Sequence, residues 1–305
     1  MKRPSITIIG PGRVGSALAR RLSDAGYRID EIVGRGGSSM RKARQLANQL
    51  PAQAAGIDRA QLAANLVWFC VPDREISTAA RALQGRNWRG KFAFHASGVL
   101  SSKALRPLAD RGAAVASVHP LMTFIPGSTP ELRGAMFAIE GSKPARDLAR
   151  EIVRRLHGCA VELRSGKKPA HHAFAMMICP LLVSLLATAE DVAGKAGTSR
   201  RAARRGMMPI MGQTLENYGR VGPASAFTGP IARGDSDTIR KHMNALTGNP
   251  AAAGVYAALA RAALQKLPAR NADAIRLVLD QFIPERTRRS RERRGRGNRR
   301  AAPRS

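Results

Sequence analysis

The sequence predicts an α/β protein, with a Rossmann-type, doubly wound and mostly parallel sheet followed by an all-α C-terminal domain. Short apolar segments alternate with amphipathic ones up to about residue 163, as they do in sheets covered by helices on both faces. A glycine-rich turn, GPGRVG at 10–15, follows the first apolar segment. After residue 165 the patterns are those of long helices only, so the fold class changes there.

The expected elements follow from hydrophobic periodicity. The run at 6–9 is apolar and β-branched and ends at Gly10, as a buried parallel strand does. Further strands are expected at 28–33, 66–71, 91–95, 113–118, 135–139 and 159–163. The helices expected in this half are 14–22, 39–50, 74–83, 101–110 and 144–157. In the second half we expect helices at 169–193, 200–217, 236–246, 250–267 and 272–282.

A chain of 305 residues with 44% apolar content is long enough for two globular domains. We expect a nucleotide-binding domain at 1–165 and a helical domain for substrate binding and dimerisation at 166–283. The segment 284–305, rich in Arg, Gly, Ser and Pro, cannot bury apolar surface, and we expect it to be a disordered basic tail.

The charge of the chain is strongly positive, with a formal value of +30. Ten Arg and two Glu in 284–305 account for +8 of it, so the other residues still carry +22. Since 41 of the 51 basic residues are Arg, genome composition explains the excess as well as an anionic partner does. We expect weak, nonspecific polyanion binding through the tail, and charge alone assigns no function.

Three cysteines far apart in the sequence exclude a disulfide framework and give no metal-site spacing, so no metal is expected. The first strand begins without a secretory signal pattern, which favours the cytoplasm. The stretch 173–189 is free of charge over seventeen residues, the lower limit for a membrane span, but a proline interrupts it. We interpret it as a helix buried within its own domain or within a dimer.

The turn at 10–15 has the G-x-G-x-x-G pattern of dinucleotide-binding proteins. Between a strand and a helix, Gly10 would form the tight turn, Gly12 would allow the pyrophosphate to approach, and Gly15 would let helix and strand pack closely. Arg13 and Val14 begin the helix, whose free N–H groups would face the phosphates. The alternative is a purely structural glycine turn.

The end of the second strand predicts which dinucleotide binds. NAD sites usually carry a carboxylate there for the ribose 2′-hydroxyl, whereas this chain has Arg35 and Ser38, followed by Arg41 and Lys42. A guanidinium and hydroxyls suit a 2′-phosphate, so NADP(H) is the predicted cofactor. The alternative is that Arg35 is one more surface arginine.

Other candidate residues also follow predicted strands, where ligands of open parallel sheets bind. We expect Val71 and Pro72 along the cofactor ribose, and Ser97 and Gly98 near the nicotinamide. His119 ends a strand and could exchange a proton with a carbonyl oxygen, although a structural histidine would fit the position equally well. His95, at another strand end, would orient the Ser97 loop.

Lys168 and His172 form a second candidate pair, because Pro169 suits the first turn of a helix and puts them on neighbouring faces. A lysine at a helix N-terminus faces the positive end of the dipole, which should depress its pKa and make it a proton donor near neutral pH. The alternative is a solvated Lys167–Lys168 pair.

A glycine-bounded loop at 228–235 interrupts the helical half. Arg233 could clamp a substrate carboxylate there. Asp235 and Ser236 are better explained as caps of the helix that follows.

With these residues in view, the chain resembles Rossmann-like proteins that carry the C-terminal domain of unknown function 2520. The resemblance covers about residues 5 to 283 and rests on motifs that are specific as a set. They are GPGRVGSALA (10–19), FCVPDREI (69–76), HASGVLSS (95–102), SVHPLMTF (117–124) and TGPIARGD (228–235). Wider relatives are pyrroline-5-carboxylate reductase, ketopantoate reductase, prephenate dehydrogenase and the β-hydroxyacid dehydrogenases.

The resemblance implies a nicotinamide-dependent reductase whose helical domain often builds a dimer. His119 looks like the basic histidine of prephenate dehydrogenases. Lys168 with His172 looks like the Lys-x-x-x-Asn pair of ketopantoate and β-hydroxyacid enzymes, with His in place of Asn. The chain departs from the family at His171, where an aromatic residue is usual, and at Cys179 and Pro180, in a helix that usually carries an Asn.

Two functions from different classes fit the sequence. The first is an NADPH-dependent oxidoreductase that reduces a small carbonyl or imine, a 2-oxo acid in the preferred version, with His119 or Lys168 as acid. The second is a non-catalytic NADP(H)-binding sensor or interaction module, tethered to nucleic acid by its basic tail. We favour the enzyme because ionisable residues gathered at one sheet edge indicate function rather than stability.

Overall fold

The computed structural model describes residues 3–164 and 166–282. The chain forms two compact units that divide between Cys179 and Pro180. Each unit has hydrophobic core clusters of its own. The basic tail expected at 284–305 lies outside the described residues.

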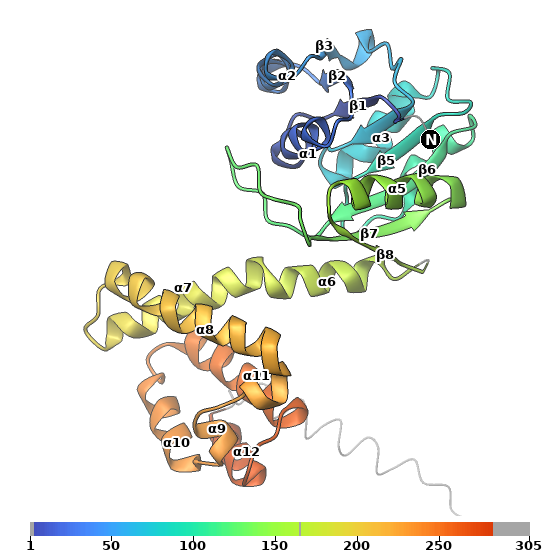
Figure 1. Cartoon of the computed structure of the whole chain (residues 1–305). Coiled ribbons are helices and arrows are strands. Elements are labelled where there is room, and N and C mark those ends of the chain that lie inside the picture. The colour runs from blue at the N-terminus through green and yellow to red at the C-terminus, as the bar shows by residue number, and fades with distance from the viewer. Residues whose placement is uncertain (1–2, 165, 283–305) are drawn as a thin grey trace, which may run out of the picture. The chain divides into compact units, whose positions relative to one another are not determined.

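The N-terminal unit is built on one eight-stranded sheet in the order β3-β2-β1-β4-β5-β6-β7-β8 (Figure 1). Neighbouring strands are parallel except β6 and β7, which are antiparallel, so the predicted Rossmann-type, mostly parallel sheet is confirmed. The strands are β1 (Ile6–Ile9), β2 (Ile29–Gly34), β3 (Gln53–Gly56), β4 (Leu66–Phe69), β5 (Phe92–His95), β6 (Ala114–Pro120), β7 (Met136–Gly141) and β8 (Cys159–Glu162).

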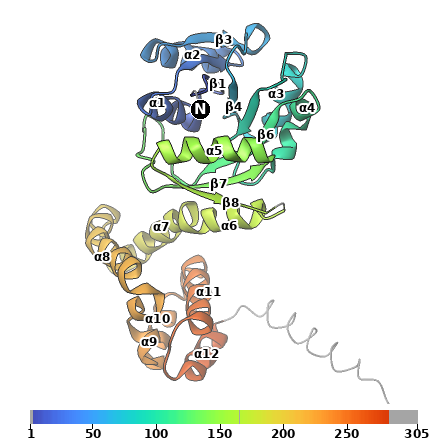
Figure 2. The same cartoon turned by 45° about the vertical axis from the view of Figure 1, so that its right-hand side comes forward.

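Helices cover both faces of this sheet (Figure 2). They are α1 (Arg13–Asp24), α2 (Gly37–Gln49), α3 (Asp73–Leu83), α4 (Arg106–Ala109) and α5 (Lys143–Arg155), with 3-10 turns at Ile57–Arg59 and Ser102–Leu105. Side chains alternate between two cores because successive residues of a strand point to opposite faces. Ile8 packs in the core under α1, α2 and α5, whereas its neighbour Ile9 packs in the core under α3 and α4.

The strand order reverses between β1 and β4, which lie side by side in the centre of the sheet. In doubly wound sheets ligands bind at this point, outside the carboxyl ends of the strands. The loops after β1, β2, β4, β5 and β6 are therefore brought to the same edge. They carry most of the candidate cofactor residues, whereas Lys168, His172 and Arg233 come from later segments of the chain.

Two details of the sheet differ from the sequence prediction. Strand β3, with the sequence QAAG, was not predicted because it lacks β-branched residues; it pairs only with β2, at the edge of the sheet. The helix expected at 101–110 is a 3-10 turn followed by the single turn of α4.

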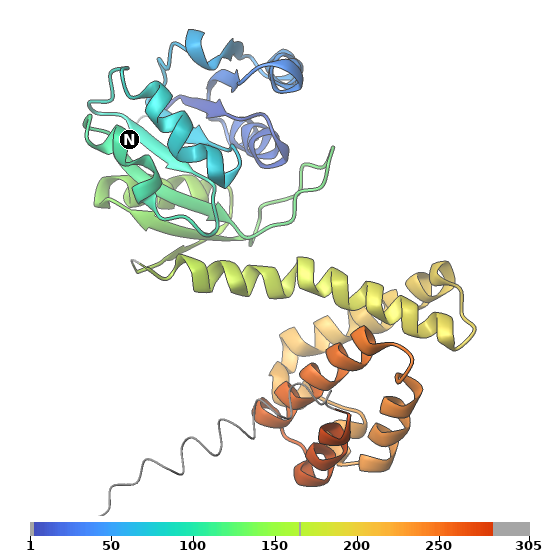
Figure 3. The same ribbon diagram turned by 180° about the vertical axis from the view of Figure 1, so that it is seen from behind.

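The C-terminal unit is all-α, as predicted, with a small core between α10, α11 and α12 (Figure 3). Its helices are α7 (Pro180–Lys195), α8 (Arg200–Ala226), α9 (Pro230–Arg233), α10 (Ser236–Ala245), α11 (Pro250–Lys266) and α12 (Ala272–Gln281). Helix α8 is longer than expected and bends at Gly222, whose φ is 76°. Asp235 caps α10 by accepting hydrogen bonds from the backbone N–H and the hydroxyl of Thr238, which confirms its predicted capping role.

The helix expected at 169–193 is interrupted. Helix α6 (Lys168–Ile178) ends at Cys179, whose backbone leaves the helical region because the residue before a proline is pushed out of it, and α7 begins at Pro180. The last strand of the sheet is β8, as predicted. Helix α6 follows this strand and still belongs to the N-terminal unit.

The stretch Lys168–Lys195 is long and apolar enough to cross a membrane by length and composition, and an 18-residue window within it has a mean hydropathy of 1.9. Only 6% of its most apolar 18-residue window is buried, so neither unit by itself buries this stretch, and its burial within a dimer stays a prediction.

Candidate functional site

A cavity of about 640 Å³ lies around the glycine turn at the carboxyl edge of the sheet. The loops after β1, β2 and β4 contribute to its walls, whereas Ser97 and Gly98, expected near the nicotinamide, are not among its lining residues. The lining includes Gly10 and Gly12 after β1, Arg35, Ser38, Ser39 and Lys42 after β2, Val71 and Pro72 after β4, and Arg74, Glu75 and Thr78 from α3.

The glycines of this turn are required by close contacts. A Cβ on Gly10, whose φ is 98°, would lie 2.8 Å from Val71 Cγ1, and a Cβ on Gly15 would overlap the carbonyl oxygen of Gly10. Gly12 differs, because its Cβ would meet only Cys70 O, at 3.9 Å, and is otherwise open to the cavity. The turn therefore leaves room for a group that approaches the backbone at Gly12, as a pyrophosphate does.

Helix α1 begins directly at this turn, with Gly12 as its N-cap and no side chain satisfying its first N–H groups. Arg13 and Val14 form the first helical turn together with Gly15, but they are not among the residues that line the cavity. What they offer is backbone N–H groups, which favour an anion at a helix N-terminus. The residues present thus fit a dinucleotide phosphate.

Among the residues that line the cavity, Arg35 forms an ion pair with Glu75, with 3.0 Å between guanidinium nitrogen and carboxylate oxygen. The backbone N–H of Arg35 also donates to the Ser39 hydroxyl. Ser38 and Lys42 line the same wall, as the NADP(H) prediction requires. Glu75 was missed from the sequence because it lies on α3, forty positions after Arg35, which is in the loop between β2 and α2.

The Ser97 loop after β5 is held by hydrogen bonds from several directions. The Ser97 hydroxyl donates to Asp73 at 2.9 Å and accepts from the backbone N–H groups of Val99 and Leu100. The Ser97 N–H donates to Nδ1 of His95. The loop is therefore tied to the start of α3 and to the end of β5.

His95 is fully buried and performs the orienting role that was predicted for it. Since Nδ1 accepts from Ser97, its Nε2 must carry the proton that it shares with the carbonyl oxygen of Ser101, 3.0 Å away. Burial lowers the pKa of His95 to about 4, although the Ser101 carbonyl opposes the shift. It is a neutral imidazole that fixes a loop.

Lys168 begins α6 and is only 1% exposed, whereas Lys167 beside it is exposed. Its ammonium donates to the carbonyl oxygen of Ser97 at 2.8 Å. Burial lowers the pKa of Lys168 to about 8, and the carboxylates of Glu140 and Asp73 offset part of this shift. The predicted depression of its pKa is thus present with desolvation as its leading cause, and the alternative of a solvated Lys167–Lys168 pair is excluded.

Three histidine rings gather beside Lys168. The ring of His119, at the end of β6, lies 5.6 Å from that of His171 and 6.2 Å from that of His172, measured between centroids. Gly98 makes this possible, because a Cβ there would lie 2.5 Å from His172 Cδ2 and 2.9 Å from His119 Nε2. The structure therefore brings together the predicted residues His119, His172, Gly98 and Lys168.

The electrostatics of the cluster keep His119 neutral. Burial first, and then repulsion from Lys168 and the neighbouring histidines, lower the pKa of His119 to about 3. Among the described residues, Nδ1 of His119 and Nε2 of His171 are buried without a hydrogen-bond partner. His171 was noted in the sequence only as a departure from the family pattern; its position one residue before His172 on α6 puts it in the same cluster.

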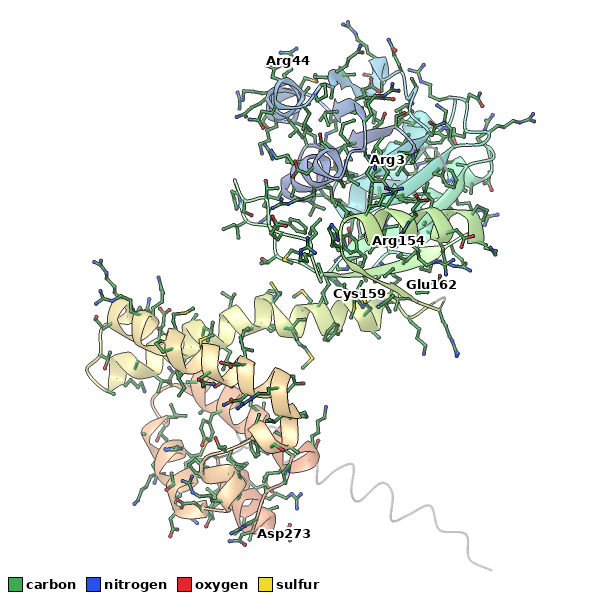
Figure 4. All side chains as sticks on the ribbon, viewed as in Figure 1. Arg3, Arg44, Arg154, Cys159, Glu162 and Asp273 are labelled. Atoms are coloured by element: carbon green, nitrogen blue, oxygen red, sulfur yellow. The ribbon has the colours of Figure 1, made fainter. Side chains whose placement is uncertain are left out.

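Arg233 ends α9 in the C-terminal unit and is exposed, with no ion pair to a described residue. Its predicted contact with a substrate carboxylate stays a prediction. Most other arginines are also spread over the surface, for example Arg44 on α2 and Arg154 on α5 (Figure 4).

The sequence matches two protein families. Residues 1–120 match the Rossmann-like domain, and residues 135–263 match the domain of unknown function 2520. The chain is therefore a Rossmann-like protein with this C-terminal domain, and the predicted membership is confirmed. None of the curated proteins matches the sequence.

Several solved structures share the fold. A Bacteroides fragilis protein assigned as an NADP oxidoreductase is similar over 85% of this chain and 97% of its own, with 22% identity and a TM-score of 0.70. A protein from Thermotoga maritima covers 90% of this chain and 98% of its own, with 22% identity and a TM-score of 0.66. The reductive aminase from Aspergillus terreus, solved with NADPH, is similar over 90% of this chain and 99% of its own, with 17% identity and a TM-score of 0.61. Identities of this size establish a shared fold.

Replacing Gly98 by Ala tests whether the cluster depends on this close approach. The added methyl group would collide with the His119 and His172 rings, so we expect a loss of about 1–3 kcal/mol in the free energy of unfolding and displaced imidazole NMR signals. Gly85→Ala is the matched control, because nothing lies within 4 Å of a Cβ there. Equal stability of the two variants, with unchanged imidazole signals, would contradict the geometry.

Proposed function

We propose that this protein is an NADPH-dependent oxidoreductase that reduces a small carbonyl or imine substrate, preferably a 2-oxo acid. The observation that carries the proposal is the buried Lys168 ammonium, set among imidazoles at the same sheet edge as the dinucleotide cavity. A buried lysine with a depressed pKa is a poor device for stability and a suitable acid near neutral pH. The alternative of a non-catalytic NADP(H)-binding module leaves Lys168 unexplained.

The cofactor proposal is supported by the cavity at the glycine turn and by the three cations in its wall, Arg35, Lys42 and Arg74. A related fold holds NADPH in the Aspergillus terreus reductive aminase. Bound NADPH would supply a hydride to the substrate carbon. The chain's own task is then to orient the acceptor and to deliver a proton to its oxygen or nitrogen.

Lys168 is the better proton donor of the two candidates. One of its three N–H groups is held by the carbonyl oxygen of Ser97, which leaves two for a substrate. With a pKa of about 8 it is mostly protonated at neutral pH and can lose the proton easily. His119, with a pKa of about 3, is neutral there, so it can orient a substrate by hydrogen bonding but cannot act as an imidazolium acid.

Titration with NADPH and with NADH tests the cofactor. We expect NADPH to bind more tightly, and Arg35→Ala to weaken NADPH binding about tenfold, because a charge-assisted hydrogen bond to the 2′-phosphate is lost. NADH binding should change little. Arg44→Ala is the control. It removes an exposed arginine on α2, the helix that follows Arg35, and Arg44 does not line the cavity. Failure of the protein to bind either dinucleotide would refute the proposal.

The pH dependence of turnover tests Lys168. With a panel of 2-oxo acids and cyclic imines, we expect kcat/KM for NADPH oxidation to fall as pH rises above about 8, because Lys168 loses its proton there. Lys168→Met should reduce the rate by roughly 10²–10⁴. Lys168→Arg, which stays charged, should lack the decline, and Lys167→Met should behave as the wild type. Full activity in Lys168→Met would exclude this role.

The predicted homodimer is supported by α8. This helix of 27 residues buries none of them within the chain, although it carries apolar side chains. The strongly exposed ones are Met208, Ile210, Leu215, Tyr218 and Val221. A surface of this kind is covered by an interface, and a second copy offers the same apolar chemistry.

Analytical ultracentrifugation checks the dimer. We expect the wild type to sediment as a dimer without detergent and Ile210→Glu to dissociate it, since a charge would enter an apolar interface. Leu277→Glu on α12 is the matched control, because both side chains are 68% exposed. A monomeric wild type, or one that stays in solution only with detergent, would refute the assignment.

A further inference from the structure

The cavity wall contains one carboxylate among its charged side chains, and it lies where the cofactor hypothesis would least expect it. Arg35, Lys42 and Arg74 are positive, whereas Glu75 is negative and pairs with Arg35. An exposed ion pair contributes little to stability. The pair therefore needs another explanation, and its position beside the proposed 2′-phosphate site suggests one.

The two partners are held very differently. The Arg35 side chain is 75% exposed, whereas that of Glu75 is 24% exposed. Glu75 lies in the first turn of α3, and its backbone N–H donates to the carbonyl oxygen of Pro72 at 2.7 Å. A carboxylate in this turn is also favoured by the helix dipole. Glu75 is thus the largely buried member of the pair and Arg35 the exposed one.

We propose that Glu75 limits the preference for NADPH by competing with its 2′-phosphate for Arg35. This inference rests on the proposed NADPH-dependent function. A phosphate that binds Arg35 must displace the Glu75 carboxylate and must also lie near it, and like charges at this range repel each other. NADH carries no 2′-phosphate, so its binding leaves the Arg35–Glu75 pair intact. Glu75 is accordingly a specificity-determining residue that acts through Arg35.

The experiment measures Kd for NADPH and for NADH by fluorescence in Glu75→Gln. We expect NADPH to bind about two- to fivefold more tightly, the range that an exposed pair of charges can contribute. The Kd for NADH should change by less than about twofold, so the selectivity ratio rises. Glu162→Gln is the matched control: it removes one negative charge from another arginine-paired carboxylate, on β8 and outside the cavity lining.

A double-mutant cycle shows whether the effect passes through Arg35. In an Arg35→Ala background, Glu75→Gln should no longer improve NADPH binding. An unchanged selectivity ratio in Glu75→Gln would overturn the inference, and so would the same gain in NADPH affinity with and without Arg35. In either case, NADPH binding by the wild type would leave the proposed function standing. A wild type that binds neither dinucleotide would overturn both.

Discussion

The hydrogen bond from the Lys168 ammonium to the carbonyl oxygen of Ser97 is the interaction on which the site depends. It joins the first residue of α6 to the loop after β5, seventy-one positions earlier in the chain. The same carbonyl accepts from the Ser117 hydroxyl of β6, and the Ser97 hydroxyl donates to Asp73 at the start of α3. Four elements therefore meet at one residue.

This arrangement explains how a charged lysine can be buried. A buried ammonium without partners would be strongly destabilised, whereas here a backbone carbonyl accepts from it and two carboxylates favour its charge from nearby. Desolvation outweighs these contributions, so the pKa of Lys168 is lowered. Because the carboxylates offset part of the shift, it falls only to about 8. Burial first, and then repulsion from Lys168, keeps the imidazole of His119 neutral. The site thus combines the buried Lys168 ammonium with the neutral imidazole of His119.

The sequence predicted those parts of the site that local pattern determines. The glycine turn, the strand ends and the pair of Lys168 with His172 were all found from spacing, because each is a few residues long. Glu75 and His171 gained their roles only in the fold: Glu75 meets Arg35 across the cavity, and His171 meets His119 across the sheet edge. Burial of Lys168 likewise depends on residues far away in the chain, so the sequence could predict the direction of its pKa shift but not its leading cause.

In the fold, too, elements with a local sequence pattern were predicted, and elements that depend on distant residues were not. Apolar β-branched strands such as β1 were predicted, whereas β3 was not, since an edge strand of small residues takes its structure from pairing with β2. The break between α6 and α7 follows from Pro180, but the apolar run around it concealed the boundary. Helix α8 shows a further limit, because its apolar side chains suggest a buried helix in the sequence, whereas none of its residues is buried in the structure.

The most direct test of this account is an NMR titration of Lys168 in ¹³C-labelled protein, with Lys168→Arg to assign the signal. We predict that the Lys168 signal titrates at about pH 8, because burial disfavours its charge. A Lys168 signal that titrates near the ordinary value of 10.5 would contradict a buried, desolvated ammonium, and with it the assignment of Lys168 as the proton donor.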